Sequence, residues 1–294
     1  MKSNIILLAM LCLSASMISA QSFKETINKT YAFEKKSSAN AVMIFNINGD
    51  VEVEGTTGDQ IVLEVQKTIT AKTESRLAEG KEEIQLGSMD LADTLIFYVK
   101  GTGSEFGRNS NRWNKNKEWG YHSERHGRWE DKSYDYSMHF KVKVPLNAHV
   151  YASTINDGDI IISNTRGQVS AININGHIKL KQIAGKTYAN TINGNVDIDY
   201  IKNPGDDSRY YTLNGDIHVN FPSNVSANMS FKSFNGSLYT NIDPLESLPA
   251  IVNKTETGKG IKFKVETERY KIRNGGPLLD VETFNGDAFI KEVK

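Results

Sequence analysis

A short segment built around Asn-Gly recurs seven times along the chain and constrains the fold more than any other feature. The consensus is Thr, Ser or Asn, a large apolar residue, Asn, Gly, a polar residue and then alternating apolar residues, and in one copy Asp157 stands between Asn and Gly. From Gly158 to Gly236 the repeated glycines lie 18, 18, 21 and 21 residues apart. A fixed period of this kind indicates stacked repeats. The copies are NINGDVEV (46–53), TINDGDIII (154–162), NINGHIKL (173–180), TINGNVDI (191–198), TLNGDIHV (212–219), SFNGSLYT (233–240) and TFNGDAFI (283–290).

Asn-Gly between apolar residues is also the strongest local signal for a β-hairpin. A two-residue hairpin would place the residue before Asn opposite the residue after Gly, on one side of the sheet. This arrangement pairs Ile192 with Asn195, and it joins an apolar to a polar residue in the other two-residue copies as well. If the chain instead runs on through a bend, Ile192 shares an apolar face with Val196 and Ile198. We therefore favour corners, where Gly supplies a positive φ and Asn tolerates one.

Stacked corners predict an all-β fold, a parallel β-solenoid with coils of 18–21 residues, apolar side chains inside and polar ladders outside. Asn193 should then lie near Asn175 and Asn214 of the neighbouring coils. The Thr and Ser residues two positions before each corner Asn should form a similar ladder. The predicted corner residues are Asn48, Gly49, Asn156, Gly158, Asn175, Gly176, Asn193, Gly194, Asn214, Gly215, Asn235, Gly236, Asn285 and Gly286.

Residues 1–20 have the layout of a secretory signal peptide. Lys2 precedes an apolar run from Ile5 to Leu13, and a stretch of small residues ends at Ala20. Leu11 stands before Cys12, which argues against a lipid anchor at that cysteine. Cys12 is the only cysteine, so the mature chain has no thiol for disulfides or metal sites. We expect an exported protein of the periplasm or cell surface.

Charge narrows the range of partners. Removing Lys2 leaves 34 basic and 35 acidic residues, a net charge of −1 with neutral histidines. This balance argues against nucleic acid as a partner. After residue 20 no apolar stretch approaches the roughly 20 residues that span a bilayer, so no transmembrane segment is expected.

The repeats divide the rest of the chain. Residues 21–40 are polar and lack clear periodicity, and residues 41–150 alternate as strands of an N-terminal β region that caps the coils. A short helix is predicted over 78–86. The repeats occupy 151–294, with an insertion at 241–277 that reads as a loop and a strand pair.

A second insertion, at 101–132, is polar and holds all three tryptophans. Long loops between strands are either functional or disordered, so plain flexibility, contact with a partner or glycan, and metal binding all stay open here. His122 and His126 lie four residues apart, but the flanking Gly120 and Gly127 argue against a helix that would pair them at a metal. No metal or other cofactor is therefore expected. The candidate contact residues are Trp113, Trp119, Tyr121, His122, His126 and Trp129.

Two further patterns were weighed as sites. The polar residue after the corner Gly is acidic in four copies, Asp50, Asp159, Asp216 and Asp287. Stacked acids could bind Ca²⁺, although calcium-binding coils have a denser Gly/Asp pattern, so a role in the turns is favoured. Asp197, Asp199, Lys179 and Lys181 occupy outward positions where an enzyme could hold acids and bases. Alternating charge is ordinary on a solvated sheet, and no catalytic residue is assigned.

Three stretches of the sequence resemble a known family. These are FKVKVPLNAHVYASTINDGDIII (140–162), the successive ING segments, and the ending YKIRNGGPLLDVETFNGDAFIKE. Together they resemble the bacterial putative-adhesin family of secreted β-strand-repeat proteins of unknown function, over roughly residues 41–293. The resemblance implies a β-helix-like fold and export, and it carries over no catalytic residue. The insertion at 101–132 is not part of the family pattern.

These observations predict a non-enzymatic, exported adhesin or envelope scaffold. It would bind a glycan or an envelope protein through an extended polar face and the aromatic insertion. A polysaccharide-active enzyme on the same scaffold is one alternative. A protein that assembles end to end into filaments through open coil edges is another.

Overall fold

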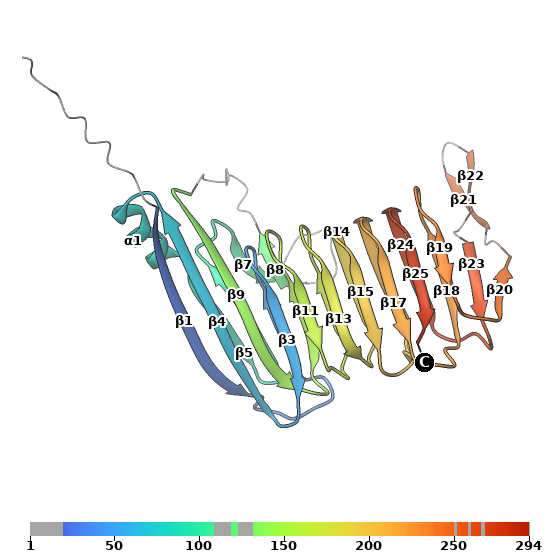
Figure 1. Ribbon diagram of the computed structural model, residues 1–294, viewed down its shortest axis with the longest axis horizontal. Coiled ribbons are helices and arrows are strands. Elements are labelled where there is room, and N and C mark those ends of the chain that lie inside the picture. The colour runs from blue at the N-terminus through green and yellow to red at the C-terminus, as the bar shows by residue number, and fades with distance from the viewer. Residues whose placement is uncertain are drawn as a thin grey trace, which may run out of the picture.

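The computed structural model describes residues 20–108, 119–122, 132–249, 252–257, 260–265 and 268–293. Two large β-sheets stack face to face, with their strands running across the long axis of an elongated molecule (Figure 1). Two small antiparallel hairpins complete the described strands. They are β7 (Glu105–Arg108) with β8 (Trp119–His122), and β21 (Val252–Thr257) with β22 (Gly260–Val265).

The first sheet has ten strands. Every neighbouring pair from β9 to β19 is parallel, whereas β4 is antiparallel to both β1 and β9. In order across the sheet they are β1 (Gln21–Ala32), β4 (Gln60–Ala71), β9 (Tyr134–Pro145), β3 (Val51–Thr56), β11 (Ile160–Ser163), β13 (Ile178–Ile183), β15 (Val196–Tyr200), β17 (Ile217–Phe221), β25 (Ala288–Glu292) and β19 (Leu238–Thr240).

The second sheet has eleven strands. It is parallel from β18 to β6, and antiparallel at β20–β23, β23–β18 and β6–β5. In order across the sheet they are β20 (Leu245–Leu248), β23 (Glu268–Ile272), β18 (Ala227–Lys232), β24 (Leu278–Asn285), β16 (Ser208–Asn214), β14 (Thr187–Asn193), β12 (Val169–Ile172), β10 (His149–Ser153), β2 (Ala41–Phe45), β6 (Thr94–Lys100) and β5 (Gln85–Leu91).

The predicted parallel β-solenoid is therefore wrong, because both large sheets are mixed. An open sheet edge offers its backbone donors and acceptors to another strand. Antiparallel strands take this place at both ends of the second sheet and at the β1 end of the first, whereas the other end of the first sheet is the parallel β25–β19 pair. At one end, β1, β4 and β9 have 12 residues each and are longer than the strands of the repeats. β1 also lies in the segment that appeared to lack periodicity. β4 and β9 fall in the region 41–150 that alternation predicted as strands, but alternation does not indicate that β4 runs antiparallel to both of its neighbours.

The Asn-Gly segments are corners between the two sheets, as predicted, and not hairpins. β14 ends at Asn193 in the second sheet, and β15 begins at Val196 in the first. The side-chain amide of Asn193 donates to Oδ1 of Asn175 at 2.8 Å, and that of Asn214 donates to Oδ1 of Asn193 at 2.9 Å. The same contact links the seven corner residues in the order Asn48, Asn156, Asn175, Asn193, Asn214, Asn285, Asn235.

This order differs from the order along the chain. The C-terminal repeat lies inside the stack, because β24 pairs with both β16 and β18, and β25 pairs with both β17 and β19. Figure 1 shows these two strands in red, between orange strands that come earlier in the chain. The first repeat is placed in the same way, with β2 between β6 and β10, and β3 between β9 and β11.

In most repeats the residues just before the corner face the opposite way from the prediction, whereas Ile47 in the first repeat is buried, as predicted. Thr191 is fully buried, and its hydroxyl donates to the carbonyl oxygen of Gly176 at 2.9 Å. Ile192 is 37% exposed instead of facing the core. The reason is that the corner glycine leaves a carbonyl that needs a donor, and the threonine supplies it. Equivalent bonds join Thr154 to Gly49, Thr212 to Gly194 and Thr283 to Gly215.

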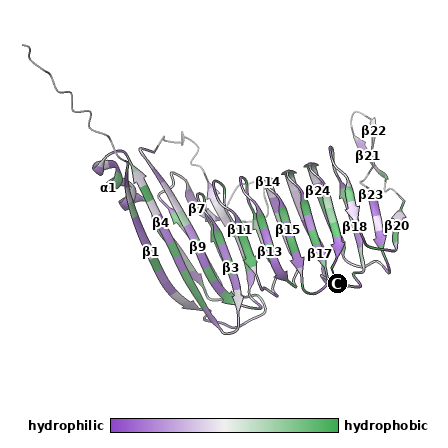
Figure 2. Cartoon of the chain, in the orientation of Figure 1, coloured by the Kyte–Doolittle hydropathy of each residue, from purple (hydrophilic) through white to green (hydrophobic). Residues whose placement is uncertain are grey.

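The core fills the space between the sheets, and Figure 2 shows hydrophobic and hydrophilic residues alternating along the strands. Each repeat contributes inward residues from both of its strands, such as Ala189, Val196 and Ile198. The corners stack so closely that they admit only glycine. A Cβ on Gly194, which has φ +157°, would lie 2.2 Å from the carbonyl oxygen of Gly176.

Helix α1 (Glu74–Glu83) packs on β4, β1 and β9 at one end of the sandwich. The helix predicted over 78–86 exists, but it begins earlier, at the Thr73 cap whose side chain accepts from the Arg76 amide. Lys67, only 2% exposed, donates to the carbonyl of Ile84 at 3.0 Å and pairs with Glu25 at 3.0 Å. A cation at this position offsets the partial negative charge of the helix C-terminus.

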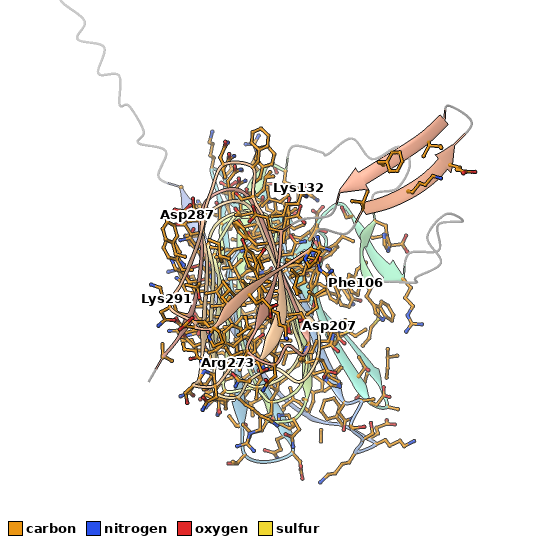
Figure 3. All side chains as sticks on the ribbon, turned by 90° about the vertical axis from the view of Figure 1, so that its right-hand side faces the viewer. Phe106, Lys132, Asp207, Arg273, Asp287 and Lys291 are labelled. Carbon is orange, nitrogen blue, oxygen red and sulfur yellow. The ribbon has the colours of Figure 1, made fainter. Side chains whose placement is uncertain are left out.

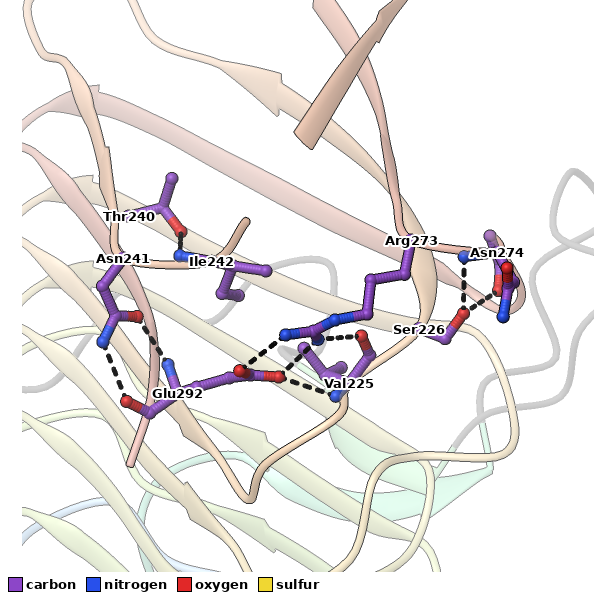
Figure 4. A network of polar contacts seen from close by, with 9 residues as sticks. Val225, Ser226, Thr240, Asn241, Ile242, Arg273, Asn274 and Glu292 are labelled. Atoms are coloured by element: carbon purple, nitrogen blue, oxygen red, sulfur yellow. Dashed lines mark hydrogen bonds and ion pairs between the residues drawn. The ribbon is translucent and has the colours of Figure 1, made fainter. Parts of the chain in front are cut away.

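A polar network fixes the last described strand at the other end (Figure 4). The Arg273 guanidinium binds both carboxylate oxygens of Glu292, at 2.6 and 2.9 Å, and also the carbonyl of Val225 at 2.7 Å. Asn241 donates to the Glu292 carbonyl and accepts from the Glu292 amide, in the manner of a paired strand. These bonds join β25 to the loops around it.

Candidate binding face on the second sheet

The outer face of the first sheet is charged. Most of one row across it is charged or polar, and the row ends in stacked aromatic rings; in register it reads Lys141, Glu52, Ile161, Lys179, Asp197, His218, Phe289 and Tyr239. Several of these charges are paired, as in the Lys179–Asp159 contact at 3.2 Å. Asp197 and Lys179, weighed above as enzyme candidates, thus belong to a solvated face of alternating charge.

The outer face of the second sheet is rich in aromatic and apolar side chains. Their neighbours along each strand are buried, so these residues point away from the core. We call this surface the aromatic face. One row in register consists of Met43, Tyr151, Ser170, Tyr188 and Arg209, and a second of Tyr98, Phe45, Ser153, Ile172, Asn190 and Tyr211.

The β7–β8 hairpin packs on one end of the aromatic face. The Phe106 ring stacks on Tyr98 with centroids 4.2 Å apart and lies 5.0 Å from Phe45. Figure 3 shows Phe106 on the opposite side of the molecule from Lys291, which belongs to the first sheet. The described part of the aromatic insertion is therefore joined to the sheet by ring contacts.

Three predicted contact residues lie on this hairpin, and they have different surroundings. The Tyr121 hydroxyl accepts from the Val99 amide at 2.9 Å and donates to the Phe45 carbonyl at 2.9 Å. Burial raises the pKa of Tyr121, so this residue anchors the hairpin as a neutral phenol. Nε2 of His122 donates to the Gly107 carbonyl at 2.9 Å across the hairpin. Trp119 stacks on Phe106 at 5.9 Å. Trp113, His126 and Trp129 lie outside the described residues.

Trp119 also borders a hollow of about 480 Å³ on the aromatic face. Tyr151 and Tyr188, both half-buried, line the same hollow. Hydroxyl groups of the sheet reach the same hollow, so flat rings and hydrogen-bonding groups alternate along it. Its lining residues are Met43, Phe45, Trp119, Tyr151, Ala152, Ser153, Ser170, Ile172 and Tyr188.

A row of apolar side chains runs beside the corner asparagines, at one margin of the aromatic face. We call it the apolar ridge. At one end of the ridge the rings of Phe284 and Phe234 stack with their centroids 4.8 Å apart, and Phe234 is 73% exposed. The ridge is the outward-facing set that the sequence appeared to place in the core. Its members are Ile155, Ile174, Ile192, Leu213, Phe284 and Phe234.

The polar residues after the corner glycines form a ladder of their own. Asp159 accepts the backbone amide of His177 at 2.8 Å, and Nδ1 of His177 accepts that of Asn195 at 2.9 Å. Asp50, Asn195, Asp216 and Asp287 accept the next amides in the same way, at 2.8 to 3.0 Å. What this position requires is an acceptor, and Asp, Asn and neutral His all supply one. The four acids have this role in the turns.

A larger hollow of about 780 Å³ lies under the loops that follow β1, β3 and β9. Its charged lining residues and Asn40 are bound to the protein itself. Lys36 pairs with Asp59 of a neighbouring loop, and the Asn40 side chain bonds to the Lys35 carbonyl at 2.8 Å and the Ser37 amide at 2.7 Å. Because these groups already have protein partners, the aromatic face is the stronger candidate for a ligand.

Sequence reasoning singled out Trp119 but missed the tyrosines on the sheet. In the sequence, Tyr151 and Tyr188 look like ordinary outward positions of alternating strands. Their distance in the chain from Trp119 hides that all three meet at one hollow. The usable signal was the recurrence of aromatic residues at outward positions of successive repeats.

Comparison with known proteins gives distant structural similarities. No family model and no curated protein matches the chain. Separately, no helix in the described part of the chain has the length and apolarity to cross a membrane. A putative cell adhesion protein from Clostridium sporogenes is 10% identical, with 92% of this chain and 100% of that chain covered and a TM-score of 0.40. A putative adhesin from Bacteroides fragilis is 11% identical, covers 92% and 97%, and has a TM-score of 0.38. A putative lipid binding protein from Parabacteroides distasonis is 12% identical, covers 92% and 97%, and has a TM-score of 0.32.

Proposed function

We propose that this chain is a non-catalytic, adhesin-like binding protein that holds an extended glycan across the aromatic face. The observation that carries the proposal is the hollow between Trp119, Tyr151 and Tyr188. Aromatic rings offer flat apolar area on which a sugar ring can stack, and their hydroxyl groups can bond to its polar edge. Ser153 and Ser170 add hydroxyls between the rings.

The spacing of the sheet supports an extended ligand. Neighbouring strands lie about 4.8 Å apart, so successive side chains within one row of the aromatic face repeat at a distance close to the length of one sugar unit. Export, predicted from residues 1–20, would bring the face into contact with glycans of the envelope or of other cells.

The test is a panel of oligosaccharides titrated by calorimetry, with products analysed in parallel. We expect binding without product release. A variant with Tyr151→Ala and Tyr188→Ala should lose at least about tenfold in affinity, because removing one base-stacking ring costs about 1–3 kcal/mol in nucleic-acid complexes and sugars stack comparably. Tyr239→Ala, on the outer face of the first sheet, is the matched control and should bind normally.

Tryptophan fluorescence gives a second measurement. With Trp113→Phe and Trp129→Phe, Trp119 is the remaining tryptophan and reports on the hollow directly. Its emission should change with saturating glycan in the parent and not in the double tyrosine variant. Failure of every glycan to bind, binding of peptides in their place, or release of shortened products would each overturn the proposal.

A further inference from the structure

Each corner Asn-Gly is a site where the asparagine can in principle deamidate. In this reaction the backbone nitrogen of Gly loses its proton to water or hydroxide and attacks Cγ of Asn. A C–N bond forms, the Cγ–Nδ2 bond breaks and ammonia leaves. Water then opens the resulting succinimide ring to aspartate or isoaspartate. Glycine favours the attack because it has no side chain to hinder the approach. The sequence holds seven Asn-Gly pairs, and the seventh, outside the repeats, is Asn274–Gly275.

In six of the seven pairs the glycine amide nitrogen that would attack already donates a backbone hydrogen bond. The amides of Gly176, Gly194 and Gly215 donate to the carbonyls of the next corner at 2.9, 3.0 and 3.0 Å. Those of Gly49 and Gly286 do the same at 3.1 and 3.3 Å, and that of Gly275 donates to Ile272 at 2.9 Å. Attack at these positions first requires the hydrogen bond to open, and the stacked corners resist such opening.

Gly236 is the exception. Its corner is the last of the stack, so within the described residues no carbonyl lies beyond it to accept its amide. Gly236 and Asn235 are both exposed, whereas the glycines of the other six pairs are buried or partly buried. It also borders a hollow of about 490 Å³, which gives water access to the ring that would form.

We infer that Asn235 is the deamidation site of the folded protein, while five of the other asparagines are protected by the stack and Asn274 by the local bond from Gly275 to Ile272. The change has a local consequence. The Asn235 amide donates to Oδ1 of Asn285 at 2.9 Å, and a carboxylate at this position has no proton to donate. Isoaspartate in addition lengthens the backbone at the corner between β18 and β19. The modification therefore loosens the terminal corner from the repeat beneath it.

The experiment incubates the folded full-length protein at mildly alkaline pH and follows each Asn-Gly peptide by mass spectrometry. We expect the mass of deamidation at Asn235 first, roughly two- to tenfold faster than at Asn193 or Asn214, which is the factor that the net contribution of one hydrogen bond supplies. In chaotrope-unfolded protein the seven sites should react at similar rates, which separates the effect of the fold from that of sequence. Asn235→Gln should abolish the early product. Equal rates at Asn193 and Asn235 in the folded protein, or a faster reaction at Asn274, would overturn the inference.

Discussion

The buried threonine ladder gives the sharpest test of what holds the corners together. Thr191→Val keeps the shape of the side chain but removes the hydroxyl that donates to the Gly176 carbonyl at 2.9 Å. A buried acceptor left without its donor costs about 1–3 kcal/mol. The added methyl group recovers up to about 0.8 kcal/mol by burial. We expect a net loss of about 1–2 kcal/mol in the free energy of unfolding.

For a chain of this size, each kcal/mol lowers Tm by about 2–4 °C, so calorimetry or circular dichroism should detect a fall of about 2–8 °C. Ser233→Ala is the matched control. Ser233 occupies the same position in the last corner, but its buried hydroxyl has no partner among the described residues. Removing it should leave Tm unchanged or raise it. If Thr191→Val is neutral, or if both variants lose the same stability, the hydroxyl-to-glycine bond does not hold the corners.

Three further predictions concern the corners and the terminal network. His177→Ala removes an acceptor and should cost about 0.5–1.5 kcal/mol, whereas His177→Asn should be close to neutral; urea unfolding measures both. Gly194→Ala, whose Cβ would lie 2.2 Å from a carbonyl oxygen, should cost more than about 3 kcal/mol or prevent folding, while Gly205→Ala has open space and should fold normally in the same expression test. The hydrogen bond from Arg273 lowers the pKa of Glu292, so its stabilisation is fully present above the ordinary carboxyl pKa and is lost as pH falls through the lower folded value. Glu292→Gln should therefore be less stable at neutral pH and should flatten the acid side of the stability profile; an unchanged profile would refute this role.

Much of the middle of the fold followed from the sequence. The mismatch of Ile192 with Asn195 excluded hairpins, and the stacking of Asn193 between Asn175 and Asn214 is confirmed. The side-chain direction before each corner was wrong, because hydropathy alone ranks Ile192 as core. It takes no account of the glycine carbonyl that needs the buried hydroxyl of Thr191.

The ends of the sheets and the candidate site were harder to predict for a different reason. β1 presents only Phe23, Ile27 and Tyr31 as partly buried apolar residues against the core, which is too sparse for strand alternation to show. In addition, the order of strands along the chain does not say which strands lie next to each other in the sheet. For this reason neither the antiparallel ends nor the meeting of Trp119 with Tyr188 could be predicted from periodicity.

The placement of β24 and β25 has a consequence for how the molecule completes itself. Because residues 278–292 form an interior layer, the stack cannot be built by adding layers in the order of synthesis. Until this segment arrives, β16 and β18 in one sheet, and β17 and β19 in the other, lack the strand that joins them. The unpaired backbone groups on those edges can pair with a strand of another molecule. The fold can therefore be completed only after residues 278–292 have been made. Loss of this segment would remove an interior layer of both sheets, although the strands on either side of that layer would still be present in the chain.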